Sequence, residues 1–565
     1  MAARLTTYVV VAIVSATLIA GLIVGAQRDD SDGPVDLIVH NALVYTADED
    51  QSIEEAVAIR GNQVLRVGSN REIMRLRRPQ TIVIDAKGAA VVPGFNDAHV
   101  RFIDGGLSLD AIDLQDATTS DAVQERLKAF ATAHRARQWI RARRWMDGAF
   151  ADTPTRQLLD EAVADRPVII VSADKRSAWV NSQALKRAGI TRRTADPADG
   201  TIVRDHRGDA SGVLRGSAVA LVDRLVPAAS REDRAAALFA AIKEANRHGI
   251  TSVQTLGEPI ENFELYDAAR KAGDLTVRVY GALAMSAKLS DAEVDRIGEV
   301  ARKYPDDPLF KTGAAKLRVD GEVESRTASL LEPYADKRMN AEPWIAADDL
   351  NRTARILDSY GWQVMTQAAG DRAVNMALYA YAHAARSNAA PPRGRRHRLE
   401  HPDVIAEPDV PRVRSLGVIA SVSPRDAADL RSELLGPERA LRADAIKAIA
   451  GTGARIALGS DWPDSSLNPL AVLERATHVE AEPDADARAT SPALSLKAAI
   501  DAYTIGASYA SFDEQRKGSI TPGMLADIVV LSNDIFAKTA LPLSSTTVAV
   551  TIFDGKIVYR RGTTN

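Results

Sequence analysis

The chain has 565 residues, no cysteine, and 71 basic against 75 acidic residues, for a formal net charge of −4. Its hydrophobic share of 46% and charged share of 26% are ordinary for a folded globular protein. The lack of cysteine excludes thiolate ligands, catalytic thiols and disulfides. The balanced charge gives no basic surface of the kind that binds nucleic acid, so we expect no nucleic-acid partner.

The N-terminal segment is long, apolar and uncharged. Residues 5–27 contain no charged side chain, lie after Arg4, and are followed by the acidic sequence "RDDSDGP". A helix of this length spans a bilayer core of about 30 Å. A signal peptide cleaved after Ala26 is the alternative, but the apolar stretch is longer than signal peptides usually carry. We therefore expect a membrane anchor with the body outside the cytoplasm, on the periplasmic side of the inner membrane in a Gram-negative cell.

Both ends of the chain beyond this segment show strand patterns. Residues 35–48 and 54–69 alternate apolar and polar residues around a Gly-Asn turn, and residues 518–532 and 548–562 have the same character. The sequence predicts one small β-sandwich built from both ends. The predicted divisions are residues 1–30 for the anchor or signal peptide, 31–90 and 518–565 for the β-sandwich, and 91–517 for a central barrel.

The central region alternates helical patterns with short apolar runs. Repeated strand–helix units predict parallel strands, and their number predicts an α/β fold with a distorted (β/α)8 TIM barrel. After the run that ends near residue 100, the expected strands lie within residues 166–173, 249–257, 276–283, 313–321, 362–370, 396–402, 417–424 and 454–461. Active sites of such barrels lie at the carboxyl ends of the strands.

Polar residues occur at several of these strand ends. In "VVPGFNDAHVRF" (91–102), His99 is followed two positions later by Arg101, which shares its side of a strand but cannot bind a cation. Lys316, His401 and Asp461 lie near the ends of three other expected strands. Imidazole, carboxylate and a lysine modified to a carbamate are donors that Zn²⁺ accepts. Together these residues predict a metal site.

Many longer motifs, in order, resemble the metal-dependent amidohydrolases, specifically the amidohydrolase-3 (YtcJ-like) branch. They include "VVPGFNDAHV", "SAWVNSQALKRAGI", "AAKLRVDGEVESRTASLLEPY", "GDRAVNMALYAY", "RHRLEHPDVI", "ALGSDWPDSSLNPL" and "KGSITPGMLADIVVL". The resemblance implies hydrolysis of amide-like C–N bonds by one or two divalent ions. It implies metal ligands at His99, Lys316 (carboxylated), His401 and Asp461, with Asp461 also the proton acceptor.

Four positions depart from the family pattern. Arg101, Arg176, Gln367 and Arg425 stand where the family has histidine, in "AHVRF", "DKRS", "VMTQAAGDRA" and "SVSPRDA". Fewer ligands weaken a metal site, and a fixed positive charge at Arg101 would repel a cation. These four residues are instead candidates for binding a substrate or an anion, because guanidinium groups pair well with carboxylates and phosphates.

Three interpretations follow. In the first, the metal site is depleted, hydrolysis is weakened or lost, and the protein is an exported pseudoenzyme that binds a ligand or acts as a scaffold. In the second, it is an active hydrolase with one divalent ion, which we expect to be zinc. In the third, it performs metal-independent chemistry on an anionic substrate. The expected partners are a small-molecule substrate or anionic ligand, the membrane through residues 5–27, and a protein partner that the sequence does not identify.

Overall fold

The computed structural model describes residues 34–562 apart from 147–152, 173–175, 287, 337–338, 425–427, 443–444, 478–493, 538–539 and 541. The predicted anchor at 5–27 lies outside these residues. Among the described helices, none is long and apolar enough to cross a membrane. The chain forms two compact units, one of residues 1–100 with 245–565 and one of residues 101–244.

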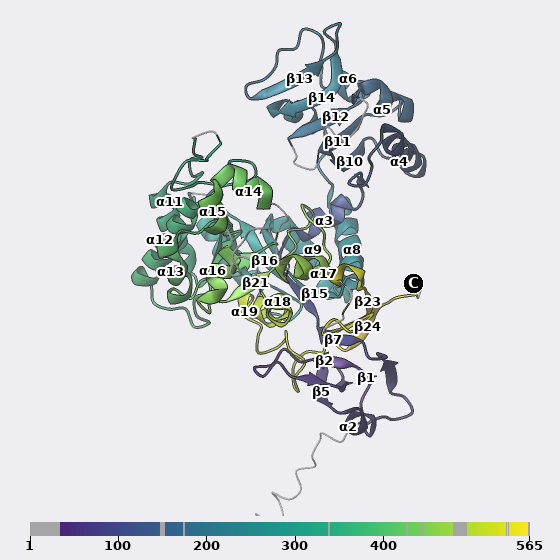
Figure 1. The fold of residues 1–565 in the computed structure, drawn as a ribbon, viewed down its shortest axis with the longest axis vertical. Coiled ribbons are helices and arrows are strands. Elements are labelled where there is room, and N and C mark those ends of the chain that lie inside the picture. The colour runs from purple at the N-terminus through teal and green to yellow at the C-terminus, as the bar shows by residue number, and fades with distance from the viewer. Residues whose placement is uncertain are drawn as a thin grey trace, which may run out of the picture. The chain divides into compact units, whose positions relative to one another are not determined.

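The first unit contains an α/β barrel of eight parallel strands (Figure 1). In spatial order the strands are β8 (Phe95–Val100), β15 (Ile250–Glu258), β16 (Arg278–Ala284), β17 (Phe310–Arg318), β18 (Gln363–Gln367), β19 (Arg398–Glu400), β20 (Ile419–Val422) and β21 (Ile456–Leu458). The barrel is nearly closed, because a parallel bridge pairs Val100 with Trp462 after β21. These strands are almost wholly buried, including several of their polar residues.

Helices surround the barrel strands in this unit (Figure 1). They are α9 (Ile260–Ala272), α10 (Asp291–Lys303), α11 (Ala347–Ser359), α12 (Asp371–Ser387), α13 (Val410–Ser415), α14 (Ala428–Leu435), α15 (Pro437–Arg442), α16 (Ala445–Gly451), α17 (Pro469–Thr477), α18 (Leu496–Tyr503) and α19 (Ile505–Ala510), with 3-10 turns at Glu407–Asp409 and Leu543–Ser545. Ser290 caps α10 with a reciprocal bond to Glu293, and Ser495 caps α18.

Strands from the two ends of the chain form two further sheets in the first unit. The four-stranded sheet contains β5 (Gln63–Gly68), β4 (Ala56–Arg60), β1 (Leu37–His40) and β6 (Ile82–Asp85), with α2 (Asn70–Met74) after β5. The six-stranded sheet contains β24 (Lys556–Arg560), β23 (Val548–Phe553), β22 (Ile528–Leu531), β7 (Ala90–Pro93), β2 (Leu43–Tyr45) and β3 (Ile53–Glu54). Apolar side chains of both sheets share one core, in which Val57 and Ile552 are fully buried.

Residues 101–244 carry a sheet of their own. Its order is β13 (Gly200–Arg204), β14 (Ala210–Gly216), β12 (Ser177–Val180), β11 (Val168–Ser172), β10 (Ile140–Trp145) and β9 (Ile112–Asp113). The helices are α3 (Phe102–Ser108), α4 (Ser120–Ala133), α5 (Arg156–Ala162), α6 (Ser182–Arg187), α7 (Ala220–Asp223) and α8 (Arg231–Arg247), with a 3-10 turn at Ser217–Val219. The expectation that 166–173 is a barrel strand is therefore wrong. Its apolar pattern fits any buried strand, and its neighbours here are β10 and β12.

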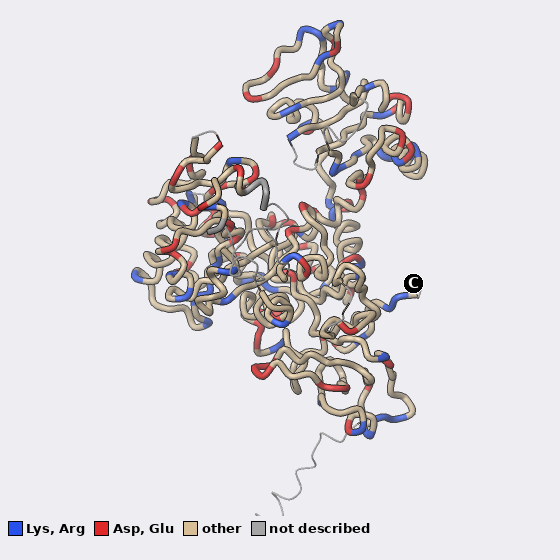
Figure 2. The backbone as a smooth tube through the Cα atoms, viewed as in Figure 1, with Lys and Arg blue, Asp and Glu red and all other residues tan. Residues whose placement is uncertain are grey.

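Basic and acidic residues are interspersed along the backbone of the first unit (Figure 2). The basic run at 393–398 lies at the start of β19, and three of its arginines bind other residues of the same chain. Arg395 pairs with Asp358, and Arg396 pairs with Glu514. Arg393 donates to the carbonyl oxygens of Gly313 and Gly361.

Candidate metal centre

Three candidate ligands from three elements converge at the carboxyl end of the barrel. His99 lies on β8, His401 directly follows β19, and Asp461 follows β21. The Nε2 atoms of His99 and His401 are 3.0 Å apart, and Oδ1 of Asp461 lies 3.6 Å and 3.9 Å from them. All three residues are buried.

These separations suit a small divalent ion. Two ligand atoms each about 2 Å from a tetrahedral ion lie about 3.3 Å from each other. Two imidazole nitrogens and one carboxylate oxygen are also the donor types that zinc accepts. The described residues therefore include a group of three candidate ligands whose spacing suits one ion.

Glu400 determines which nitrogen of His99 faces this cluster. Its Oε2 lies 2.6 Å from Nδ1 of His99. Burial alone would raise the pKa of Glu400, but the charges of Arg398 and Lys316 hold that pKa well below its usual range. Because an ionised carboxylate only accepts hydrogen bonds, the proton sits on Nδ1 of His99 and the lone pair on Nε2.

The fully buried Arg398 supports Glu400 in turn. Its Nε lies 2.7 Å from Oε1 of Glu400, and its other nitrogens donate to Gln254, to Ser421 and to the carbonyl oxygen of Ala98. Burial and the nearby Lys316 lower the pKa of His99, against the opposing effect of Glu400. His99 is therefore a neutral donor near pH 7, as metal binding requires.

The backbone at the ligands is strained. His401 and Asp461 have φ angles of 55° and 59°, in the left-handed region that few non-glycine residues adopt. The amide of Asp461 donates to the carbonyl oxygen of His99 over 2.8 Å. Such strained residues cluster at functional sites, where the surrounding fold holds them in place.

Asp97 and Gly459 place β8 against the loop after β21. The buried Asp97 accepts hydrogen bonds from the backbone amides of His99 and Ser460 and from Tyr503, while burial raises its pKa to about 6. A side chain on Gly459 would lie 2.4 Å from the amide nitrogen of His99. Only glycine permits this close approach.

Lys316 lies inside the barrel on β17. Its Nζ is buried and has no hydrogen-bond partner among the described residues. Burial lowers its pKa to about 8, while the negative charges of Glu400 and Asp461 oppose that shift. Lys316 therefore lies within electrostatic range of the cluster, although the structure shows no bond from it to the three ligands.

The other predicted site residues are placed as follows. Gln367 ends β18, is buried, and donates to the carbonyl oxygen of Asp320 over 3.4 Å. Arg101, which is half-buried before α3, and the exposed Arg176 belong to the unit of residues 101–244. Arg425 lies outside the described residues. That these residues bind a substrate or an anion therefore stays a prediction.

Two further residues of the centre, Arg398 and Glu400, were not among the site residues predicted from the sequence. The available signal was the sequence "RHRLEHP" (396–402), in which both charged residues alternate along a strand otherwise expected to be buried. On such a strand they need partners inside the barrel.

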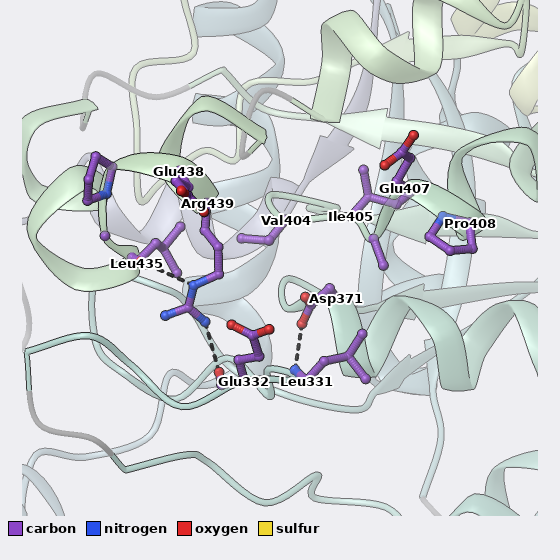
Figure 3. A pocket seen from close by; sticks show the side chains of 13 residues that line it. Leu331, Glu332, Asp371, Val404, Ile405, Glu407, Pro408, Leu435, Glu438 and Arg439 are labelled. Atoms are coloured by element: carbon purple, nitrogen blue, oxygen red, sulfur yellow. Dashed lines mark hydrogen bonds between the residues drawn. The ribbon is translucent and has the colours of Figure 1, made fainter.

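A separate pocket of about 600 Å³ lies among the loops that follow the barrel strands (Figure 3). Its lining includes Leu331, Glu332, Asp371, Val404, Glu407, Leu435, Glu438 and Arg439. Arg439 donates to the backbone oxygens of Leu435, Glu332 and Pro333. Acidic side chains outnumber this one basic side chain in the lining. None of the three candidate ligands lines it.

Comparison with known proteins decides the family. The amidohydrolase family matches residues 82–559. The chain belongs to this family. Protein LONG AFTER FAR-RED 3 of Arabidopsis thaliana and YtcJ of Bacillus subtilis are each 30% identical to this amidohydrolase over 542 residues. Those alignments cover 93% of this chain and 91% and 99% of the relatives. The N-substituted formamide deformylase of Arthrobacter pascens is 26% identical over 550 residues, covering 93% of this chain and 98% of that protein.

A solved structure shares the fold of this amidohydrolase. An uncharacterised metal-dependent hydrolase from Pyrococcus furiosus aligns with a TM-score of 0.70 and 22% identity, over 87% of this chain and 98% of that one. The prediction of family and of an α/β barrel is therefore confirmed.

Proposed function

We propose that the protein is a hydrolase of amide-like C–N bonds that uses one divalent ion held by His99, His401 and Asp461. The observation that carries this proposal is the convergence of their three donor atoms, with the lone pair of His99 directed inward by Glu400. Family membership gives the reaction class. When bound, the ion would polarise a carbonyl group and make a water molecule acidic enough to attack it near neutral pH.

The side chains of the centre have distinct roles in this proposal. His99 and His401 supply neutral nitrogen donors, and Glu400 and Arg398 orient His99. Asp461 lies beside both imidazoles, so its carboxylate is placed to take a proton from the attacking water. We assign zinc as the expected ion from the donor set. Lys316 is a further candidate ligand if it is carboxylated.

The experiment is a hydrolysis screen on amides, ureas, lactams and N-acyl amino acids, with and without a chelator. We expect chelator-sensitive turnover that His401→Asn abolishes, since asparagine tolerates the left-handed backbone but is a poor metal ligand. The exposed His206 provides the control His206→Asn, which should retain full turnover. Turnover that survives both chelation and His401→Asn would refute the proposal.

The alternative, in which hydrolysis is weakened or lost, rests on the replaced histidines at Arg101 and Gln367. It predicts a folded protein without bound metal that retains affinity for an anionic ligand. Metal content therefore separates this alternative from the active hydrolase.

We further propose that residues 5–27 anchor the protein in a membrane with its body outside the cytoplasm. The uncharged sequence of this segment supports the proposal. A protease added to cells whose outer membrane is permeabilised, but whose inner membrane is intact, should digest the chain after residue 27. Protection from the protease, or a soluble product cleaved after Ala26, would refute the anchor.

A further inference from the structure

Arg318 is an exposed residue at the carboxyl end of β17, on the rim of the barrel. It is the last residue of β17, two positions after Lys316, so both side chains point to the same side of the strand. In register, Arg318 pairs with Gln367 of β18, which pairs with Glu400 of β19. Paired residues of parallel strands share a face, and Glu400 contacts His99 across the barrel. Arg318 therefore faces the same interior as the metal centre.

The guanidinium of Arg318 contacts an aromatic ring rather than a carboxylate. Its central carbon lies 5.1 Å from the ring centre of the exposed Trp344, and the amide of Trp344 donates to Val319 over 2.7 Å. Within the part of the chain that the structure describes, no carboxylate forms an ion pair with Arg318. A stacked guanidinium keeps its hydrogen-bond donors in the ring plane free for a ligand.

A second basic residue lies on the same side of β17 as Arg318. Lys316 lies one pleat deeper on the same side, and its buried Nζ has no hydrogen-bond partner among the described residues. Two cations thus follow each other along β17. Of the ordinary chemical groups, a carboxylate matches a guanidinium best because it accepts two parallel hydrogen bonds.

The spacing fits a compact substrate. Adjacent strands are about 4.8 Å apart, so the Cα atoms of Arg318 and Glu400, two strands apart in one row, are separated by about 10 Å. A carboxylate bound at Arg318 would then lie a few bonds from a C–N group held beside His99. The acidic pocket of Figure 3 is lined by other residues.

We propose that Arg318, stacked on Trp344, binds a substrate carboxylate, so that the substrates of this amidohydrolase are amide-like compounds with a carboxylate close to the scissile C–N bond. This inference rests on the proposed function for the reaction, but the carboxylate subsite itself needs only Arg318 and Trp344. Arg318 is distinct from the arginines that the sequence suggested for anion binding.

The test measures ligand binding to the full-length, metal-free protein. Its result therefore does not depend on whether the protein binds a metal ion. The probes are hippurate (N-benzoylglycine) and its neutral amide, titrated by calorimetry. We expect hippurate to bind at least about tenfold more tightly than the amide, and Arg318→Met to remove that preference. Arg318→Lys, which keeps the charge but not the paired donors, should give an intermediate affinity.

The control is Arg386→Met, because Arg386 is an exposed arginine on α12. It should bind hippurate like the unchanged protein, and circular dichroism should show that every variant is folded. Equal affinity for hippurate and its amide, no binding of either, or an unchanged preference in Arg318→Met would each overturn the carboxylate subsite.

Discussion

Nδ1 of His99 and Oε2 of Glu400 lie 2.6 Å apart, and this contact places the proton of His99 on the nitrogen that faces away from the other two candidate ligands. The lone pair on Nε2 then faces His401 and Asp461. Partners that orient a metal-binding histidine in this way are often as important for affinity as the ligands.

The first prediction concerns Glu400→Gln. The change keeps the shape of the side chain but removes the charge that fixes the tautomer of His99. Metal affinity measured by competition with a chelator should fall by about 10- to 100-fold. Glu514→Gln, which alters an ion pair with Arg396 at the other end of β19, should leave the affinity unchanged. Equal affinities in the two variants would contradict the role of Glu400.

The second prediction concerns Gly459→Ala. The added methyl group would lie 2.4 Å from the amide nitrogen and 2.6 Å from Cβ of His99, so β8 or the loop after β21 must move. We expect a loss of about 1–3 kcal/mol in the free energy of unfolding and weaker metal binding. Gly451→Ala is the control, since a side chain there meets no atom within 4 Å. A Gly459 variant as stable as the Gly451 variant would show that Gly459 and His99 are not in close contact.

The third prediction uses the pH dependence of stability. The folded pKa of Lys316, about 8, is below its ordinary value of 10.5. Between these values the unfolded chain binds a proton that the folded chain has released, so the free energy of unfolding rises with pH across this window. Below pH 8 both states are protonated, and the burial cost is constant.

In the Lys316→Met variant, the free energy of unfolding should therefore rise by about 3 kcal/mol less between pH 8 and 10.5 than in the unchanged protein. The measurement is denaturant unfolding of the metal-free protein. Lys517 is also buried with a lowered pKa, but it is present in both proteins and cancels in the comparison. Parallel stability curves for the two proteins would contradict the buried ammonium.

The fourth prediction restores the family pattern. Arg101→His together with Gln367→His places histidine at two positions where the family resemblance predicts a ligand. We expect the number of bound divalent ions to rise from one to two per chain, measured by elemental analysis. Each single change should leave one ion. An unchanged count in the double variant would mean that these positions are not lost ligands.

The barrel was predictable because each of its strands carries a local signal. Short apolar runs alternating with helical patterns indicate parallel strands, and their polar ends placed His99, His401 and Asp461 at one rim. The run at 166–173 has the same local signal but lies in another sheet, since the partner of a strand depends on long-range packing that a short window of sequence does not contain.

The two residues that orient His99, directly or indirectly, were less predictable. Arg398 and Glu400 are charged, and charged residues are usually exposed. They are fully buried because each neutralises the other inside the barrel. The contact of Glu400 with His99 joins residues about 300 positions apart in the chain, so the partner of Glu400 could not be identified from local sequence. Arg318 was overlooked for the same reason, because its neighbour Trp344 lies on a long loop.

Metal analysis of the purified full-length protein shows whether His99, His401 and Asp461 hold an ion. After exposure to zinc and removal of free ion, we expect one tightly bound divalent ion per chain, lost together with turnover when His401 is replaced by asparagine. A folded protein that holds no ion under these conditions would contradict it.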